Sequence, residues 1–149
     1  EWLLKSVEAA GFEDALYIAT DRAGMPWMSG GGCLITRDFL RMGLLFSRRG
    51  LGVLNRSIGS KNFINETINF SGPKYMALGK DNYVFYANQA MKSKDWIGHS
   101  GYGGQFLMIN LKTNVVAGFF SVLETPSATD ENYKIDMIQM LEEIVSRNY

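Results

Sequence analysis

The sequence predicts an α/β protein of the α+β type, in which helices pack on an antiparallel sheet. The clearest sign of the sheet is a hairpin: arms 103–111 and 115–123 are rich in β-branched and aromatic residues and flank a turn at Lys112–Asn114. The clearest helix begins near Asp130, after Pro126 breaks the strand. Its apolar stripe at helical spacing consists of Ile135, Ile138, Leu141, Ile144 and Val145, with Met137 at the margin.

Two further helices and a short strand are expected in the first fifty residues. Apolar residues at helical spacing predict helices over 2–10 and 37–47, and residues 15–20 read as a strand between them. The local signals that bound these helices are Gly11 as a stop, Thr36 as an N-cap, Asp38 in the first turn and Gly50 as a closing residue.

The middle of the chain is less regular. Residues 51–74 are rich in Gly, Ser and Asn, so we expect a long surface excursion with one short helix near 61–68. Two strands, 75–77 and 83–88, then flank a turn at Gly79–Asn82. No internal repeat divides the 149 residues, so we expect one region with a single core.

Composition excludes several classes of function. Lys and Arg number 15 and Asp and Glu number 15, so the formal net charge is zero and nothing favours binding to nucleic acid or to anionic lipid. No apolar run is long enough for a transmembrane helix and no signal peptide is visible, so a periplasmic, secreted or cytoplasmic location remains open.

The single cysteine excludes an internal disulfide and a cysteine-based zinc site. Its apolar neighbour Leu34 favours a buried thiol at Cys33 over a nucleophile. The sequence indicates no metal site and no cofactor.

The only histidine lies in a glycine-rich stretch, Gly98–Gln105 (GHSGYGGQ). Glycines let the main chain approach a ligand closely, and exposed main-chain N–H groups can donate to an anion. A histidine and a serine beside such a backbone are suited to bind an oxygen atom of a ligand. The alternative interpretation is a simple turn or bulge, in which the glycines serve only the backbone.

Two segments carry a resemblance to a known family. Gly30–Leu45 (GGGCLITRDFLRMGLL) resembles a segment of the β-lactamase-related serine hydrolases, which include class C β-lactamases, penicillin-binding carboxypeptidases, esterases and 6-aminohexanoate-dimer hydrolases. Gly98–Gln105 is similar to the third motif of that family, which is Lys-Thr-Gly in β-lactamases and often His-Thr-Gly or His-Ser-Gly in the esterase-like branch. The order and spacing of the two segments fit the C-terminal part of the serine β-lactamase-like fold.

The resemblance implies acyl transfer through a serine ester. It also implies that the third motif lies on the edge strand of the sheet. His99 and Ser100 would bind substrate and order the proton network, Gly101 would permit close approach, and the N–H of Tyr102 would donate to the oxyanion. The implied substrate is a small-molecule ester or amide. Histidine in place of lysine argues mildly against a strong carboxylate anchor, because a neutral imidazole holds a carboxylate less firmly than an ammonium does.

The catalytic Ser-x-x-Lys and Tyr-x-Asn motifs of the family lie upstream of the Gly-rich segment and are expected to be absent from this chain. We therefore expect a C-terminal part that is inactive alone and that pairs with the missing N-terminal half or with itself. Ser71–Lys74 and Tyr86–Asn88 do spell the two motifs. Composition alone predicts roughly half a match of each, and their strand-like surroundings differ from the family, so chance explains them.

Two other functions stay open. The chain could belong to a catalytically inactive β-lactamase-like binding or regulatory module that keeps the pocket. It could also be an unrelated α/β interaction domain, in which His99 is a hydrogen-bonded buried histidine or a turn histidine with a structural role.

Overall fold

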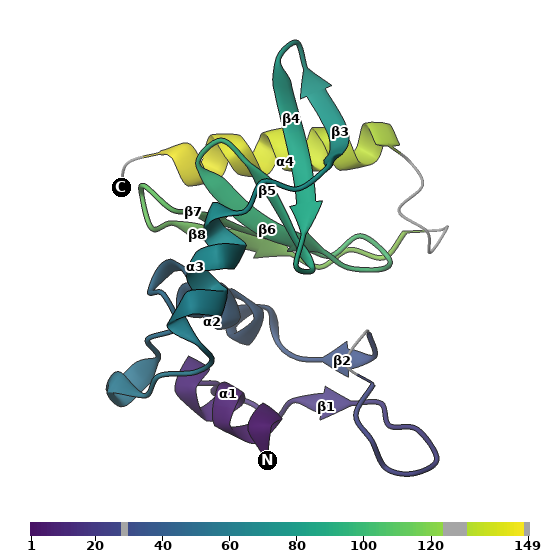
Figure 1. The fold of residues 1–149 in the computed structure, drawn as a ribbon. Coiled ribbons are helices and arrows are strands. Elements are labelled where there is room, and N and C mark those ends of the chain that lie inside the picture. Colours follow the sequence, from purple (N-terminus) through teal and green to yellow (C-terminus); the bar gives the residue numbers. More distant parts are fainter. Residues whose placement is uncertain (28–29, 124–130, 148–149) are drawn as a thin grey trace.

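A six-stranded antiparallel sheet with helices on both faces forms the centre of the molecule (Figure 1). The computed structural model describes residues 1–27, 30–123 and 131–147. Its helices are α1 (Trp2–Ala10), α2 (Thr36–Ser47), the short 3-10 helix η1 (Val53–Asn55), α3 (Lys61–Asn69) and α4 (Glu131–Ser146). Its strands are β1 (Tyr17–Ile18), β2 (Gly32–Cys33), β3 (Lys74–Gly79), β4 (Asn82–Ala87), β5 (Ala90–Ser93), β6 (Trp96–Ser100), β7 (Phe106–Asn110) and β8 (Val116–Phe119).

The sheet has the order β3-β4-β5-β6-β7-β8, so each strand pairs with its neighbours in sequence. Figure 1 shows α4 across one face and α1, α2 and α3 on the other side, while the β3–β4 hairpin extends beyond the layer. The predicted α+β class is confirmed. The described part of the chain contains no helix whose length and hydropathy would let it cross a bilayer.

Strand β7 is buried on both faces, which explains its unbroken run of apolar residues. On one face Phe106 and Met108 pack in the cluster with α4. On the other face α2 approaches closely at Gly43, where an added Cβ would lie 3.2 Å from Leu107 and 2.5 Å from Val116. A side chain at Gly43 would therefore push α2 away from the sheet.

The predicted C-terminal helix and its apolar stripe are confirmed. Ile138, Leu141 and Val145 are almost fully buried in α4, at 0%, 2% and 1% exposure. They pack against the sheet with Trp96 and Phe106, and Ile135 and Ile144 line the edge of this cluster. Burial of these side chains is the main stabilising contribution of α4.

The expected short helix near 61–68 is also confirmed, but the surrounding segment is more than a surface excursion. Helix α3 begins after Ser60, whose Oγ accepts a hydrogen bond from the N–H of Phe63 at 3.4 Å. Its buried residues Ile64 and Ile68 form a second cluster with Ala90 and Ile97 of the sheet. This cluster packs on β5 and β6, whereas α2 contacts β7 and β8.

The predicted ends of α2 were shifted by the local geometry. The N-cap position belongs to Ile35, and Thr36 is already the first helical residue, so Thr36 is not the N-cap. The C-cap is Arg48, and Gly50 follows it in a left-handed conformation with φ 83°. Gly50 donates its N–H to the carbonyl of Leu45 at 2.7 Å, so it closes the turn that follows the helix.

Strand β5 was not predicted, and β6 was expected only through the resemblance, which implies a strand at the third motif. Neither shows regular alternation, since β5 reads Ala-Met-Lys-Ser. The turn between β4 and β5 uses Asn88 and Gln89 in the left-handed region, at φ 51° and 61°. Such a turn usually contains glycine. Because this turn has none, the sequence did not indicate that a strand ends at residue 87 and another begins at residue 90.

Asp38 ties the loop after α1 to the start of α2. The residue is 0% exposed, and its carboxylate accepts hydrogen bonds from the N–H groups of Glu13 and Asp14, each at 3.0 Å. Arg41 donates to the same carboxylate at 2.6 Å and pairs with Glu13. Burial alone would raise the pKa of Asp38, but the Glu13 amide, Arg41 and the Asp14 amide together hold it below its ordinary value of 3.8.

We predict that Asp38→Asn lowers the free energy of unfolding by about 3 kcal/mol, because it removes the charge that Arg41 and two backbone amides compensate. The contribution of Asp38 is complete above about pH 4, the unfolded pKa, and is lost as pH falls toward the lower pKa of the folded state. Urea unfolding at pH 7 and pH 3 measures both effects. Asp95→Asn is the control, because its pair with Lys112 is exposed and its loss should cost under about 1 kcal/mol. Equal losses from the two variants would contradict the prediction.

Candidate functional site

The four predicted site residues lie together where β6 ends and turns toward β7. His99 and Ser100 are the last residues of β6, and Gly101 and Tyr102 begin the turn. The resemblance implied an edge strand, but β6 is an interior strand between β5 and β7. The expectation that His99 and Ser100 lie on the edge strand of the sheet is therefore wrong.

The end of β6 nevertheless has one open side. Pairing with β5 stops at Met91↔Gly98, whereas pairing with β7 continues through His99↔Leu107 and Ser100↔Phe106. Before Met91, strand β5 has only Ala90, which pairs with Ala87 of β4, and the turn at Asn88–Gln89 precedes it. His99 and Ser100 thus pair on one side only among the described strands.

Backbone alternation decides which residue presents its polar groups to that open side. The N–H of Gly101 donates to the carbonyl of Gln105 at 2.8 Å, so the backbone of Gly101 and His99 faces β7. Successive residues of a strand direct these groups to alternate sides. The N–H and C=O of Ser100 are therefore directed away from β7, toward the side on which β5 has ended.

The glycines after Ser100 are required by a tight turn. Gly103 and Gly104 are left-handed, at φ 88° and 94°, so the interpretation of this stretch as a turn is confirmed for them. Gly101 has a different reason: an added Cβ would lie 2.8 Å from Oε1 of Gln105. Tyr102 stands at the tip of the turn with 74% of its surface exposed.

His99 lies on the same face of the sheet as Ile97, because side chains alternate along a strand. The residue is exposed, yet neighbouring atoms exclude water from part of the imidazole. This desolvation lowers the pKa of His99 below its ordinary value of 6.5. The ring is therefore neutral at pH 7, when one nitrogen can donate and the other accept a hydrogen bond.

The structure does not assemble the two spelled motifs into a catalytic group. Lys74 places its Nζ 3.7 Å from the ring centroid of Tyr83. The hydroxyl of Tyr86 donates to Oε1 of Gln89 at 3.3 Å. Ser71 is exposed before β3, and no hydrogen bond joins it to Lys74 or Tyr86, all of which the structure describes.

The Gly30–Leu45 segment forms β2 and leads into α2. Strand β2 pairs with β1 through Tyr17↔Cys33 and Ile18↔Gly32, and residues 28–29 lie outside the described residues. Cys33 is exposed, so the expected buried thiol is wrong. Both residues of β2 are exposed. The apolar neighbour Leu34 therefore did not indicate burial of the Cys33 thiol.

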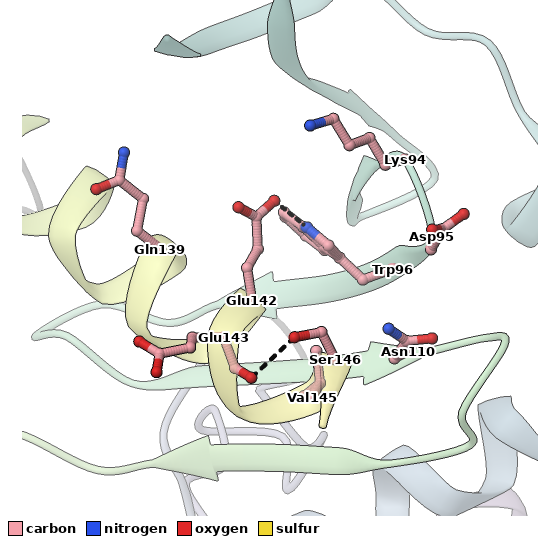
Figure 2. Close-up of a pocket in the computed structure, with 9 residues that line it drawn as sticks. All are labelled: Lys94, Asp95, Trp96, Asn110, Gln139, Glu142, Glu143, Val145 and Ser146. Atoms are coloured by element: carbon pink, nitrogen blue, oxygen red, sulfur yellow. Dashed lines mark hydrogen bonds between the residues drawn. The ribbon is translucent and has the colours of Figure 1, made fainter. Parts of the chain in front are cut away.

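A hollow that no sequence signal indicated lies at the opposite end of β6 from His99 (Figure 2). It is an open cavity of about 390 Å³ between the C-terminal half of α4 and the β5–β6 turn. The indole N–H of Trp96 donates to Glu142 at 2.7 Å, and Asp95 pairs with Lys112 at 2.8 Å. Among the described residues no cluster of His, Cys, Asp and Glu is arranged to hold a metal ion.

Comparison with known proteins places the fold. The sequence matches no family model and no curated protein. A solved structure named "Putative 6-aminohexanoate-dimer hydrolase from Bacillus anthracis" superposes on 90% of the chain with a TM-score of 0.69 and 24% sequence identity. This likeness establishes the fold. The chain has a mixed α+β fold of the serine β-lactamase-like type, and it spans 34% of that solved chain, consistent with the C-terminal part of the fold.

We predict that His99 titrates with a midpoint below 6.5, because partial burial disfavours the charged ring. The unfolded chain then binds the proton more readily, so His99 lowers stability as pH falls below about 6.5. The Cε1–H resonance followed by NMR against pH measures the midpoint, and the assignment is unambiguous because the chain has one histidine. A midpoint at or above 6.5 would instead indicate a fully hydrated ring or one paired with a carboxylate.

Proposed function

We propose that this chain supplies the oxyanion and substrate-binding wall of a hydrolase that cleaves an ester or amide through an acyl-serine intermediate. The observation that carries the proposal is the open side at the end of β6, toward which the backbone of Ser100 is directed. The fold shared with a serine β-lactamase-like hydrolase supports it. The resemblance of Gly98–Gln105 to the third motif supports it independently.

Each residue of the wall has a role that its position suits. Negative charge develops on the carbonyl oxygen of the substrate as serine attacks, and fixed N–H donors stabilise that charge. We assign this donor to the backbone N–H of Tyr102 at the turn. Gly101 leaves room beside it, and neutral His99 with the hydroxyl of Ser100 binds substrate and orders the proton network.

The nucleophile in this proposal belongs to polypeptide outside residues 1–149. The attacking serine and its lysine would come from a Ser-x-x-Lys segment, and a Tyr-x-Asn segment would supply the second proton-transfer group. Residues 1–149 alone then bind no acyl group. The comparison fits this division, because the chain spans about a third of the hydrolase it resembles in fold.

A neutral histidine points to the class of substrate. An ammonium would anchor a substrate carboxylate strongly, whereas an uncharged imidazole offers only a hydrogen bond. We therefore propose a small ester or an amide oligomer in preference to a β-lactam.

The outer edge of β8 is the surface on which we place the partner polypeptide. Strand β8 ends the sheet, both of its faces meet helices, and no charged residue occurs between Asn114 and Leu123. The opposite edge strand, β3, carries Lys74 and two register shifts, which discourage further pairing. An apolar edge without such protection suits an added strand, from the N-terminal half or from a second copy.

We predict that replacing Tyr102 by proline lowers kcat about 100-fold, because proline removes the backbone donor to the oxyanion. The assay uses a protein in which residues 1–149 are joined to the Ser-x-x-Lys segment, with a p-nitrophenyl ester as substrate. Tyr102→Ala is the matched control, since it keeps the N–H, and its exposed side chain contributes little to packing. Equal kcat values for the two variants would contradict the assignment of the Tyr102 N–H as an oxyanion donor.

A fluorophosphonate probe tests the chemistry itself. It should label the joined protein and leave residues 1–149 alone unlabelled. Binding of an ester analogue without labelling or turnover would identify a catalytically inactive binding module instead.

We predict that residues 1–149 alone self-associate, because the β8 edge and apolar side chains near it are uncovered. Val122→Lys places a charge beyond the end of β8, where the side chain is 99% exposed, and should shift the chain toward monomer in sedimentation. Leu54→Lys, at a remote site with 84% exposure, is the control and should leave association unchanged. A monodisperse wild-type monomer would contradict the open-edge assignment.

A further inference from the structure

We infer that Ser121 is a positioning residue that holds the β6–β7 turn in place, and with it the proposed oxyanion donor. The inference rests on the proposed function for its catalytic consequence. Its structural basis is separate, because it follows from contacts among Gly104, Gln105, Ser121 and Tyr133 that no sequence signal indicated.

Ser121 joins three parts of the fold through one residue. Its Oγ donates to the carbonyl of Gly104 at 2.6 Å. The same Oγ lies 3.0 Å from the hydroxyl of Tyr133, in the first turn of α4. Its backbone carbonyl accepts a hydrogen bond from Nε2 of Gln105 at 3.4 Å. The turn is therefore fastened to the segment after β8 and to α4.

The direction of the hydrogen bonds follows from the number of protons. A carbonyl oxygen can only accept, so the single hydroxyl proton of Ser121 goes to Gly104. The bond between the two hydroxyls must then be donated by Tyr133 to Oγ of Ser121. This bond favours the donor role of Ser121, because linked hydrogen bonds polarise one another.

Gln105 braces the other side of the same turn. An added Cβ at Gly101 would lie 2.8 Å from Oε1 of Gln105, and one at Gly103 would lie 3.3 Å from Nε2. The side-chain amide thus fills the space directly against both glycines. An added Cβ at Gly104 would collide with Oγ of Ser121, so the turn is held tightly from both sides.

Such support matters for a donor of this kind. A backbone N–H accelerates a reaction only if it is already aimed at the position that the oxyanion will occupy. Glycines at left-handed φ values give the turn many alternative conformations, which would misplace the N–H of Tyr102. Ser121, Gln105 and Tyr133 select one of them, and Tyr133 links the turn to the helix that carries the main core cluster.

Amide hydrogen exchange of residues 1–149 tests the structural part. In Ser121→Ala, the amides of Gly101 and Gly104, which donate to Gln105 and Gly101, should exchange about five to ten times faster. The amide of Leu107, within the ladder with His99, should be unchanged. Ser121→Thr keeps the hydroxyl and should restore slow exchange.

Two further variants sharpen this test. Tyr133→Phe removes only one hydroxyl and should give a smaller effect in the same direction. Ser146→Ala removes a hydroxyl that bonds within α4, to the carbonyl of Glu143, and serves as the matched control. Unchanged exchange in Ser121→Ala, or faster exchange that includes Leu107 equally, would overturn the inference.

Kinetics of the joined protein test the catalytic part. Ser121→Ala should lower kcat about tenfold and change KM less than about twofold, because a displaced donor weakens the transition state more than substrate binding. A wild-type protein without turnover would overturn the proposed function, while the exchange data would still decide whether Ser121 holds the turn. An active wild type whose kcat is unaffected by Ser121→Ala would overturn the inference and leave the proposed function intact.

Discussion

The burial of β7 between α4 and α2 is the interaction on which the rest of the structure depends. Phe106 and Met108 meet α4, while Leu107 meets α2 across the gap that Gly43 keeps narrow. A strand fixed on both faces by helices and on both edges by β6 and β8 is the most constrained element of the sheet. Strand β7 also fixes the position of the candidate site, because the end of β6 pairs with it.

Residues with a local physical signature were predictable from the sequence. The stripe of α4 repeats every three to four positions, Gly11 adopts the left-handed conformation that ends α1, and the hairpin turn at Lys112–Asn114 lies between two apolar strands. Each of these depends on residues within one element or one turn. The place of the candidate site along the chain followed for the same reason, since its glycines cluster within a few residues.

The features that escaped prediction depend on partners distant in sequence. Asp38 was placed by its charge in the first turn of α2, but its burial depends on amides 24 and 25 residues earlier. The three hydrogen bonds of Ser121 correspond to no periodic pattern in the sequence. The interior position of β6 depends on β5, whose four residues show neither alternation nor a glycine turn. Contacts between residues this far apart in sequence cannot be predicted from composition and motif spacing.

The two-residue turn at Asn88–Gln89 sets the width of the open side beside Ser100. It fixes where β5 starts, and so fixes how much of β6 remains without a second neighbour. A longer β4–β5 hairpin would extend the ladder past Met91↔Gly98 and occupy the backbone of Ser100 with sheet hydrogen bonds. The extent of the open side is therefore a matter of hairpin length: two residues added to or removed from the β4–β5 turn would shorten or lengthen the unpaired end of β6 without changing any residue from His99 to Tyr102.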